Sequence, residues 1–240
     1  MPTIVFIHGA AFDHSVWQWQ SRYLAHHGHS VIAVDLPGHG RSPGSVRATI
    51  GEYAEWVAGV LDAVGLPQAA LVGHSMGSLI ALETALRHGP RVGKLALVGT
   101  SAPMPVSDAF LAAAGDEPPV GLEMEAVWGH ARGVQLATSA IPGASLLSAS
   151  RRLNARSKAG ALHAALEACN AYRADAGKLK ALAMPTLVVA GKRDQMTQFK
   201  GGKALADSIP GARFVALDAG HSMMSEAPRE LLVALRGFLG

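Results

Sequence analysis

The sequence is poor in charged residues and almost free of cysteine, and both shortages narrow what the protein can be. Of its 240 residues only 16% are Asp, Glu, Lys or Arg, whereas 49% are hydrophobic. Soluble proteins average about 25% charged residues and disordered chains carry more, so we expect one sizeable buried core rather than disorder. The single cysteine, Cys169, excludes a disulfide within the chain and favours a cytoplasmic protein.

Long hydrophobic runs and aromatic-rich basic segments are also missing. The N-terminal apolar run ends at His8, which is too short for a signal peptide or a membrane span, so we expect no membrane partner. The net charge is only +3, and no aromatic residues are interleaved with the one basic cluster. A solvated helix face explains this cluster better than a nucleic-acid site does. Its members are Arg151, Arg152, Arg156 and Lys158.

Six short apolar runs, each near a turn signal, predict the strands of a sheet. They are rich in Val, Ile and Leu and do not alternate with polar residues, as expected of parallel strands buried on both faces. Helical patterns lie between them, which predicts βαβ crossovers and an α/β fold with a doubly wound, mainly parallel six-stranded sheet. The runs are Thr3–Ile7, Ser30–Val34, Ala69–Val72, Lys94–Val98, Thr186–Ala190 and Ala212–Leu217.

Two helices are well marked, and one long segment interrupts the alternation. Thr49 and Glu52 have the spacing of a capping box. An apolar stripe then follows at helical spacing: Tyr53, Trp56, Val57, Val60, Leu61 and Val64. A second helix is predicted over Pro228–Leu239. Residues 101–183 contain helical patterns but no convincing strand, so we predict a single domain over 1–240 with a helical cap inserted at 101–183.

The strongest chemical signal is the sequence Gly-His-Ser-Met-Gly at residues 73–77. It follows an apolar strand and opens a helical pattern, which is the context that a nucleophile elbow needs. Gly73 and Gly77 flank Ser75 because a side chain at either place would collide with the neighbouring backbone. The alternative is a chance glycine-rich loop. We predict that Ser75 is a catalytic nucleophile.

A serine nucleophile needs a base, and His221 is the best of eleven histidines. It lies in a loop between the last strand and the last helix. Asp194 follows the preceding strand and is predicted to orient the imidazole. The weaker candidates for the acid are Asp108 and Asp218. The other histidines have simpler explanations in loops, in the elbow or on a surface helix, and they include His8, His26, His27, His39 and His74.

The site also needs an oxyanion hole and a pocket. The backbone N–H of Met76 and one from the loop after the first strand are expected to hold the oxyanion. In that loop we choose Ala10 over Ala11. The inserted segment is expected to line the substrate pocket, although each of its residues could instead pack the core. Candidate substrate-binding residues are Ala11, Met104, Trp128 and Cys169, with Leu136 and Leu146 as further apolar candidates.

Together these motifs resemble the α/β-hydrolase superfamily over nearly the whole chain, and the order Ser75, Asp194, His221 is the order of its triad. The motifs are His8-Gly9-Ala10, Asp35-Leu36-Pro37-Gly38-His39-Gly40-Arg41-Ser42, Gly73-His74-Ser75-Met76-Gly77, Gly191-Lys192-Arg193-Asp194 and Gly220-His221. The start directly at the His-Gly strand is similar to the compact plant-type methylesterases and hydroxynitrile lyases. The lyases usually have threonine and lysine where this chain has Gly9 and Glu226, which favours an esterase.

The resemblance implies hydrolysis of a carboxylic ester or lactone through an acyl-enzyme. The predicted apolar cap favours small to medium acyl groups. Ser75 separates the chain from the dehalogenases and epoxide hydrolases, which use aspartate. No dinucleotide fingerprint, P-loop or metal-ligand spacing occurs in the sequence, so no cofactor or metal is expected. The open alternatives are enol-lactone hydrolysis, perhydrolysis, C–C bond hydrolysis, cyanohydrin lysis and, in another class, a ligand receptor on a hydrolase scaffold.

Overall fold

A six-stranded sheet forms the centre of the protein in the computed structural model, which describes residues 2–136, 139 and 141–240. Its order is β2-β1-β3-β4-β5-β6, and every neighbouring pair is parallel. This confirms the predicted α/β class with a doubly wound parallel sheet. The strands are β1 (Ile4–Ile7), β2 (Val31–Val34), β3 (Ala69–His74), β4 (Val92–Val98), β5 (Thr186–Gly191) and β6 (Arg213–Leu217).

Successive residues of the central strands point to opposite faces of the sheet, and both faces are buried. In β1, Val5 and Ile7 belong to one hydrophobic cluster, whereas Ile4 and Phe6 belong to the other. All four side chains are fully buried. The period-two geometry of a strand thus explains why the sequence shows unbroken apolar runs rather than alternation.

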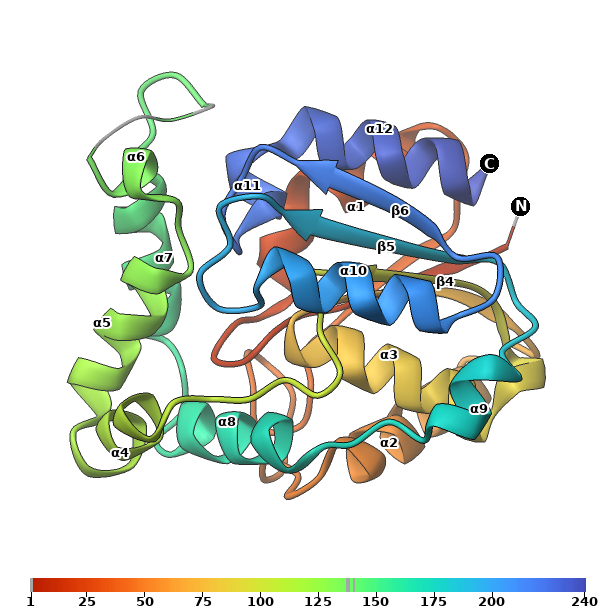
Figure 1. Ribbon diagram of the computed structural model, residues 1–240, viewed down its shortest axis with the longest axis horizontal. Helices are drawn as coiled ribbons and strands as arrows, with labels where there is room; N and C mark the ends of the chain where they lie inside the picture. Colours follow the sequence, from red (N-terminus) through yellow and green to blue (C-terminus); the bar gives the residue numbers. More distant parts are fainter. Residues whose placement is uncertain (1, 137–138, 140) are drawn as a thin grey trace.

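Helices cover each face of the sheet (Figure 1). The cluster containing Ile4 and Phe6 packs against α1 (Gln18–His26) and α12 (Pro228–Leu239). The opposite cluster packs against α2 (Ile50–Ala63), α3 (Met76–Arg87) and α10 (Phe199–Ser208). Three short helices complete this part of the chain: η1 (His14–Trp17), η2 (Gly89–Arg91) and α11 (Met223–Glu226).

The predicted capping box forms at the start of α2. The Glu52 N–H donates to the Thr49 hydroxyl at 3.1 Å, and the Glu52 carboxylate accepts from the Thr49 N–H at 3.2 Å. Tyr53, Val57 and Leu61 are buried. The predicted stripe was wrong at Val64, which is 50% exposed, because this residue is the C-cap and lies past the last helical turn.

Between β4 and β5 the described residues form helices and no strand. We call residues 101–183 the helical insertion. Figure 1 shows α4 to α7 as a separate layer beyond the carboxyl ends of the strands. The helices are α4 (Asp108–Asp116), α5 (Pro118–Trp128), α6 (Arg132–Gln135), α7 (Leu146–Asn154), α8 (Ala161–Ala171) and α9 (Ala176–Lys180). No helix within the described ranges is long and apolar enough to cross a bilayer.

Candidate active site

Ser75 occupies a sharp turn between β3 and α3. Its backbone has φ 52° and ψ −122°, a conformation that costs a non-glycine residue on the order of 1–3 kcal/mol. The turn closes because two neighbours lack side chains. A Cβ on Gly73 would lie 2.1 Å from the Gly77 carbonyl oxygen, and one on Gly77 would lie 2.4 Å from that of His8. This packing fixes Ser75 at the carboxyl edge of the sheet, at the start of α3.

The hydrogen bonds of β3 continue up to the elbow. The Ser75 N–H donates to the Val98 carbonyl at 3.0 Å, and His74 is in register with Val98 of β4. β3 therefore runs two residues beyond Val72, where the sequence predicted its end. The extension ties the backbone of the strained serine to the central strand of the sheet.

His221 and Asp194 form a buried pair at the same edge. Asp194 follows β5 and His221 follows β6, and the Arg193 N–H donates to the Ala219 carbonyl at 3.0 Å, which joins the two loops. His221 Nδ1 lies 2.8 Å from Asp194 Oδ2, and both side chains are at most 1% exposed. Because Nδ1–H donates to the carboxylate, Nε2 of the neutral ring is left free to accept a proton.

The Asp194 carboxylate is itself held by three further donors. The backbone N–H groups of Met196 and Thr197 each donate to Oδ1 at 2.8 Å. The Thr197 hydroxyl donates to Oδ2 at 2.7 Å and also lies 3.2 Å from His221 Nδ1. These contacts fix the direction from which the carboxylate meets the imidazole.

The electrostatics of the pair favour charge separation. Burial by itself disfavours the imidazolium, but the charge and hydrogen bond of Asp194 outweigh it and raise the pKa of His221 above its usual value. Burial likewise disfavours the Asp194 carboxylate, and the pairing with His221 and Thr197 nevertheless lowers the pKa of Asp194. The arrangement suits a base that must hold a proton briefly.

His74 links the elbow to the loop that carries His221. Its Nε2–H donates to the His221 carbonyl at 3.0 Å, and the two ring centroids lie 4.6 Å apart. His221 therefore lies against the turn that presents Ser75. The side-chain partners of His221 in the described structure are Asp194 and Thr197, and no hydrogen bond joins it to the Ser75 hydroxyl. Such contacts often tighten only when substrate is bound.

Ser75 opens into a cavity of about 530 Å³ between the helical insertion and the edge of the sheet. Of the predicted pocket residues, Met104, Trp128 and Cys169 line it, and so does Ala10. Ala11 does not. It is 2% exposed, has a positive φ of 56°, and lines a separate recess beside His39. The tight turn after β1 thus directs Ala11 away from the cavity that contains Ser75, so the structure does not bring it together with the other predicted substrate-binding residues.

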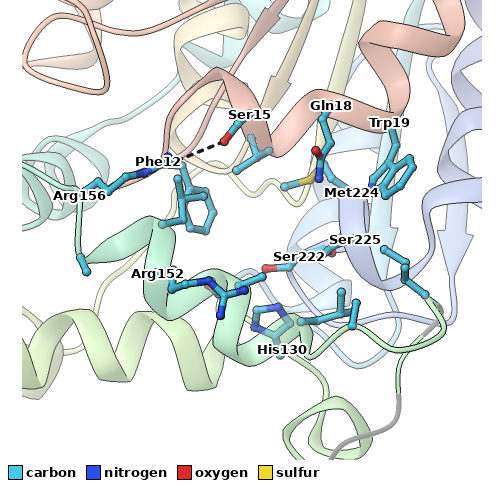
Figure 2. A pocket seen from close by; sticks show the side chains of 18 residues that line it. Phe12, Ser15, Gln18, Trp19, His130, Arg152, Arg156, Ser222, Met224 and Ser225 are labelled. Atoms are coloured by element: carbon cyan, nitrogen blue, oxygen red, sulfur yellow. Dashed lines mark hydrogen bonds between the residues drawn. The ribbon is translucent and has the colours of Figure 1, made fainter.

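A second cavity, of about 650 Å³, lies between η1, α1 and α7 (Figure 2). Figure 2 shows Ser15 and Trp19 on one wall and Arg152 and His130 on the other. Ser75 does not line this cavity, so the candidate nucleophile opens into the smaller of the two. Two further apolar candidates are also separate from Ser75: Leu146 lines the second cavity, and Leu136 is 75% exposed.

The rival acids lie elsewhere. Asp108 is exposed at the first position of α4. Asp218 is also exposed, and it accepts a hydrogen bond from Arg193 Nε at 2.6 Å. The pairing with Arg193 lowers the pKa of Asp218 and holds its carboxylate outside the site. Neither contacts His221, which leaves Asp194 as its carboxylate partner.

The sequence did not reveal the contacts of three residues near the site, although it singled out the position of Glu226. Thr197 binds Asp194, and the spacing of an aspartate that accepts the N–H three residues later is a recognisable turn signal. Glu226 Oε2 accepts from the Gly220 N–H at 3.0 Å and from the Ala131 N–H at 3.1 Å, joining the helical insertion to the His221 loop. Glu125 lines the cavity with Ser75, and nothing in its sequence context distinguishes it from a surface glutamate.

One group of side chains could hold a metal ion. Ligand atoms of Asp13, His14 and Asp35 lie within 4.8 Å of one another. They already bind partners, however: Asp35 accepts from His14 and from the Arg41 N–H, and Asp13 accepts from Arg156. None of the three lines the cavity that contains Ser75. We interpret the group as a network that fixes the loops after β1 and β2.

Comparison with known proteins decides the family. The model of the alpha/beta hydrolase family matches residues 4–235. The chain belongs to this family. It is 28% identical to 3-oxoadipate enol-lactonase 1 of Acinetobacter baylyi, over 99% of this chain and 88% of that one. It is 34% identical to a putative carbamate hydrolase of Variovorax paradoxus, over 87% of this chain and 85% of that protein.

Among solved structures, this alpha/beta hydrolase is similar to a thermophilic esterase from Thermogutta terrifontis. The TM-score is 0.86 at 26% sequence identity, and the match covers 100% of this chain and 89% of the esterase. These three relatives are named as an enol-lactonase, a putative carbamate hydrolase and an esterase. The similarity supports a hydrolase that acts on a small molecule.

Proposed function

We propose that the protein is a serine hydrolase that cleaves carboxylic esters or lactones with small to medium acyl groups. The observation that carries this proposal is the buried pair of His221 and Asp194, 2.8 Å apart, lying against a strained elbow whose serine lines a cavity. The named esterase and enol-lactonase relatives support the bond type. Ser75, Asp194 and His221 are the proposed catalytic residues.

In the proposed reaction, His221 Nε2 takes the proton of the Ser75 hydroxyl as its oxygen attacks the acyl carbon. The tetrahedral oxyanion is held by the backbone N–H groups of Met76 and Ala10. Met76 is the first residue of α3, where N–H groups have no acceptor within the helix. The imidazolium gives its proton to the leaving alcohol, and the acyl group stays on Ser75.

Water then completes the cycle. His221 takes a proton from water as the hydroxide forms a bond to the acyl carbon, and the proton returns to Ser75 when the acid leaves. In a lactone the alcohol stays joined to the acid, so the product is a single hydroxy acid. No cofactor enters this scheme, and the proposed partner is the small-molecule substrate alone. The single cysteine of the chain supports a cytoplasmic location for the protein.

We also propose that the helical insertion acts as the cap that selects substrates. Met104, Trp128 and Cys169 come from it and line the cavity. These three side chains are apolar, and an apolar wall suits neutral acyl chains. The same triad could serve C–C bond hydrolysis, perhydrolysis or cyanohydrin lysis, and a receptor could use the same scaffold. Repeated turnover of an ester separates hydrolysis from a receptor.

The test combines turnover with covalent labelling. The protein is expected to hydrolyse p-nitrophenyl butyrate over many cycles and to lose this activity on treatment with diethyl p-nitrophenyl phosphate. Mass spectrometry of the inactivated protein should place one diethylphosphoryl group on the peptide containing Ser75. A Ser75→Ala variant should remain unlabelled. A single turnover per molecule, or a label on another peptide, would contradict the proposal.

A further inference from the structure

Glu125 is a buried carboxyl group inside the cavity that contains Ser75. It lies in the last turn of α5 and is only 3% exposed. Its side chain lines the cavity together with Ser75, Ala10 and Trp128. Acidic residues are almost never this deeply buried without a cationic partner, so its position needs an explanation.

The surroundings of Glu125 hold the carboxyl group in place without neutralising it. Asn154 Nδ2 donates to Oε2 at 2.9 Å and also donates to the Leu122 carbonyl at 3.1 Å, which fixes the amide. No lysine or arginine of the described residues pairs with Glu125. Burial raises the pKa of Glu125 to about 7, against the opposing effects of Asn154 and His221. The carboxyl group is therefore present in both protonation states near neutral pH.

The chemistry of this position limits what Glu125 can bind. A substrate ammonium group would lie near His221 and would oppose the imidazolium that forms during catalysis. A substrate carboxylate would be repelled by the ionised form of Glu125. A hydroxyl group satisfies both forms, because it donates to the carboxylate and accepts from the carboxylic acid.

We propose that Glu125 is a specificity-determining residue that exchanges a hydrogen bond with a hydroxyl group of the substrate. The inference rests on the proposed ester or lactone hydrolysis and narrows its substrates to hydroxylated ones. A site built around a buried polar group disfavours a substrate that leaves part of this group's hydrogen-bonding capacity unused. Without a substrate hydroxyl, Glu125 keeps only the hydrogen bond from Asn154 among the described side chains. A substrate hydroxyl should therefore raise kcat/KM above that of the matched alkyl ester.

The experiment compares each hydroxylated ester with its matched alkyl ester. Methyl 2-hydroxybutyrate and methyl 3-hydroxybutyrate are compared with methyl butyrate, and 2-hydroxyethyl butyrate is compared with ethyl butyrate. A pH indicator follows the acid released. At least one hydroxylated ester should have a kcat/KM about tenfold above that of its match. Glu125→Leu should remove this advantage, and Glu125→Gln, which still exchanges hydrogen bonds, should keep most of it.

Glu123→Gln is the matched control, since Glu123 lies on the same helix but is exposed and binds Arg151. It should keep the wild-type ratio. Glu125→Met, with a flexible apolar side chain, replaces Glu125→Leu if the latter does not fold. A hydroxyl advantage that survives in the apolar variant, or that is absent from the wild type, would overturn the inference. Failure of the wild type to hydrolyse any ester would instead overturn the proposed function.

Discussion

At the scale of single residues, the chemistry proposed here depends on how the backbone holds three side chains. Ser75 is held in a strained conformation by two glycines, and Asp194 is held by two N–H groups and one hydroxyl. None of these contacts involves the substrate. The fold therefore prepares the site before any ligand arrives, which is the condition under which electrostatic stabilisation is most effective.

Ser75→Ala should fold normally and lose nearly all turnover. Removing the nucleophile of a serine hydrolase with this logic lowers kcat by on the order of 10⁶. The measurement is hydrolysis of p-nitrophenyl butyrate by a preparation free of host esterases, with circular dichroism as the check on folding. Retention of more than about a hundredth of the wild-type rate would exclude the serine mechanism.

Asp194→Asn should lower kcat by up to ~10⁴, because an amide favours the wrong tautomer of His221. The pH profile should change as well. In the wild type, kcat/KM should rise with its midpoint above ~6.5, since Asp194 raises the pKa of His221. Removing the carboxylate charge should move that midpoint to lower pH.

Two further aspartates are the controls for this assignment. Asp218→Asn, at an exposed ion pair with Arg193, should leave both rate and profile close to those of the wild type. Asp108→Asn should do the same, because Asp108 lies on the exposed start of α4. If Asp108→Asn proves the damaging change instead, Asp194 is not the orienting acid.

At the scale of elements, the sequence predicted correctly the features that depend on residues close together in the chain. The capping box of α2, the span of α12 and the strand–elbow–helix unit around Ser75 each depend on neighbours in sequence, and each was found. The end of β3 was misplaced because its last two residues pair with β4, a partner that is distant in sequence. The role of Glu125 was invisible for the same reason: its burial depends on Asn154 of another helix.

The helical insertion should make acyl-chain preference graded rather than absolute. Most of the residues that line the cavity of about 530 Å³ belong to the insertion, and most of these are apolar. One methylene in a fitted pocket is worth only ~1–3 kcal/mol. We expect kcat/KM for p-nitrophenyl esters to be highest for acetate to octanoate and low for palmitate, with a carboxylate-bearing ester disfavoured. Best activity on palmitate, or a large advantage for the charged ester, would show that the insertion does not enclose a small pocket suited to neutral acyl chains.

At the scale of the whole molecule, two-sided burial of the sheet places ionisable groups in its interior. Burial lowers the pKa of both His8 and His74 to about 3, so the folded protein keeps these rings neutral. Burial raises the pKa of Glu125 to about 7, and Asp194 raises that of His221. These two pairs of residues affect the pH dependence of stability in opposite directions. The stability that depends on neutral His8 and His74 is lost as the pH falls below ~6.5, and the stability that depends on protonated Glu125 and His221 is lost as the pH rises. We therefore expect maximal stability near neutral pH.

His74→Gln isolates one contribution to this balance. In the unfolded chain His74 binds a proton near pH ~6.5, whereas in the folded protein it resists protonation down to a pKa of about 3. Lowering the pH from 7.5 to 5.5 should therefore cost about 1.4 kcal/mol of unfolding free energy through this residue alone. When the pH is lowered over this interval, Glu125 and His221 add stability, so the change in the wild-type unfolding free energy is the net of opposing effects.

The measurement is urea unfolding at both pH values. On lowering the pH, the change in unfolding free energy should be about 1.4 kcal/mol less favourable for the wild type than for His74→Gln. The control is His26→Gln, because His26 is exposed on the surface of α1; its change in unfolding free energy with pH should match that of the wild type. An identical pH dependence in all three proteins would mean that His74 is protonated in the folded state at pH 5.5.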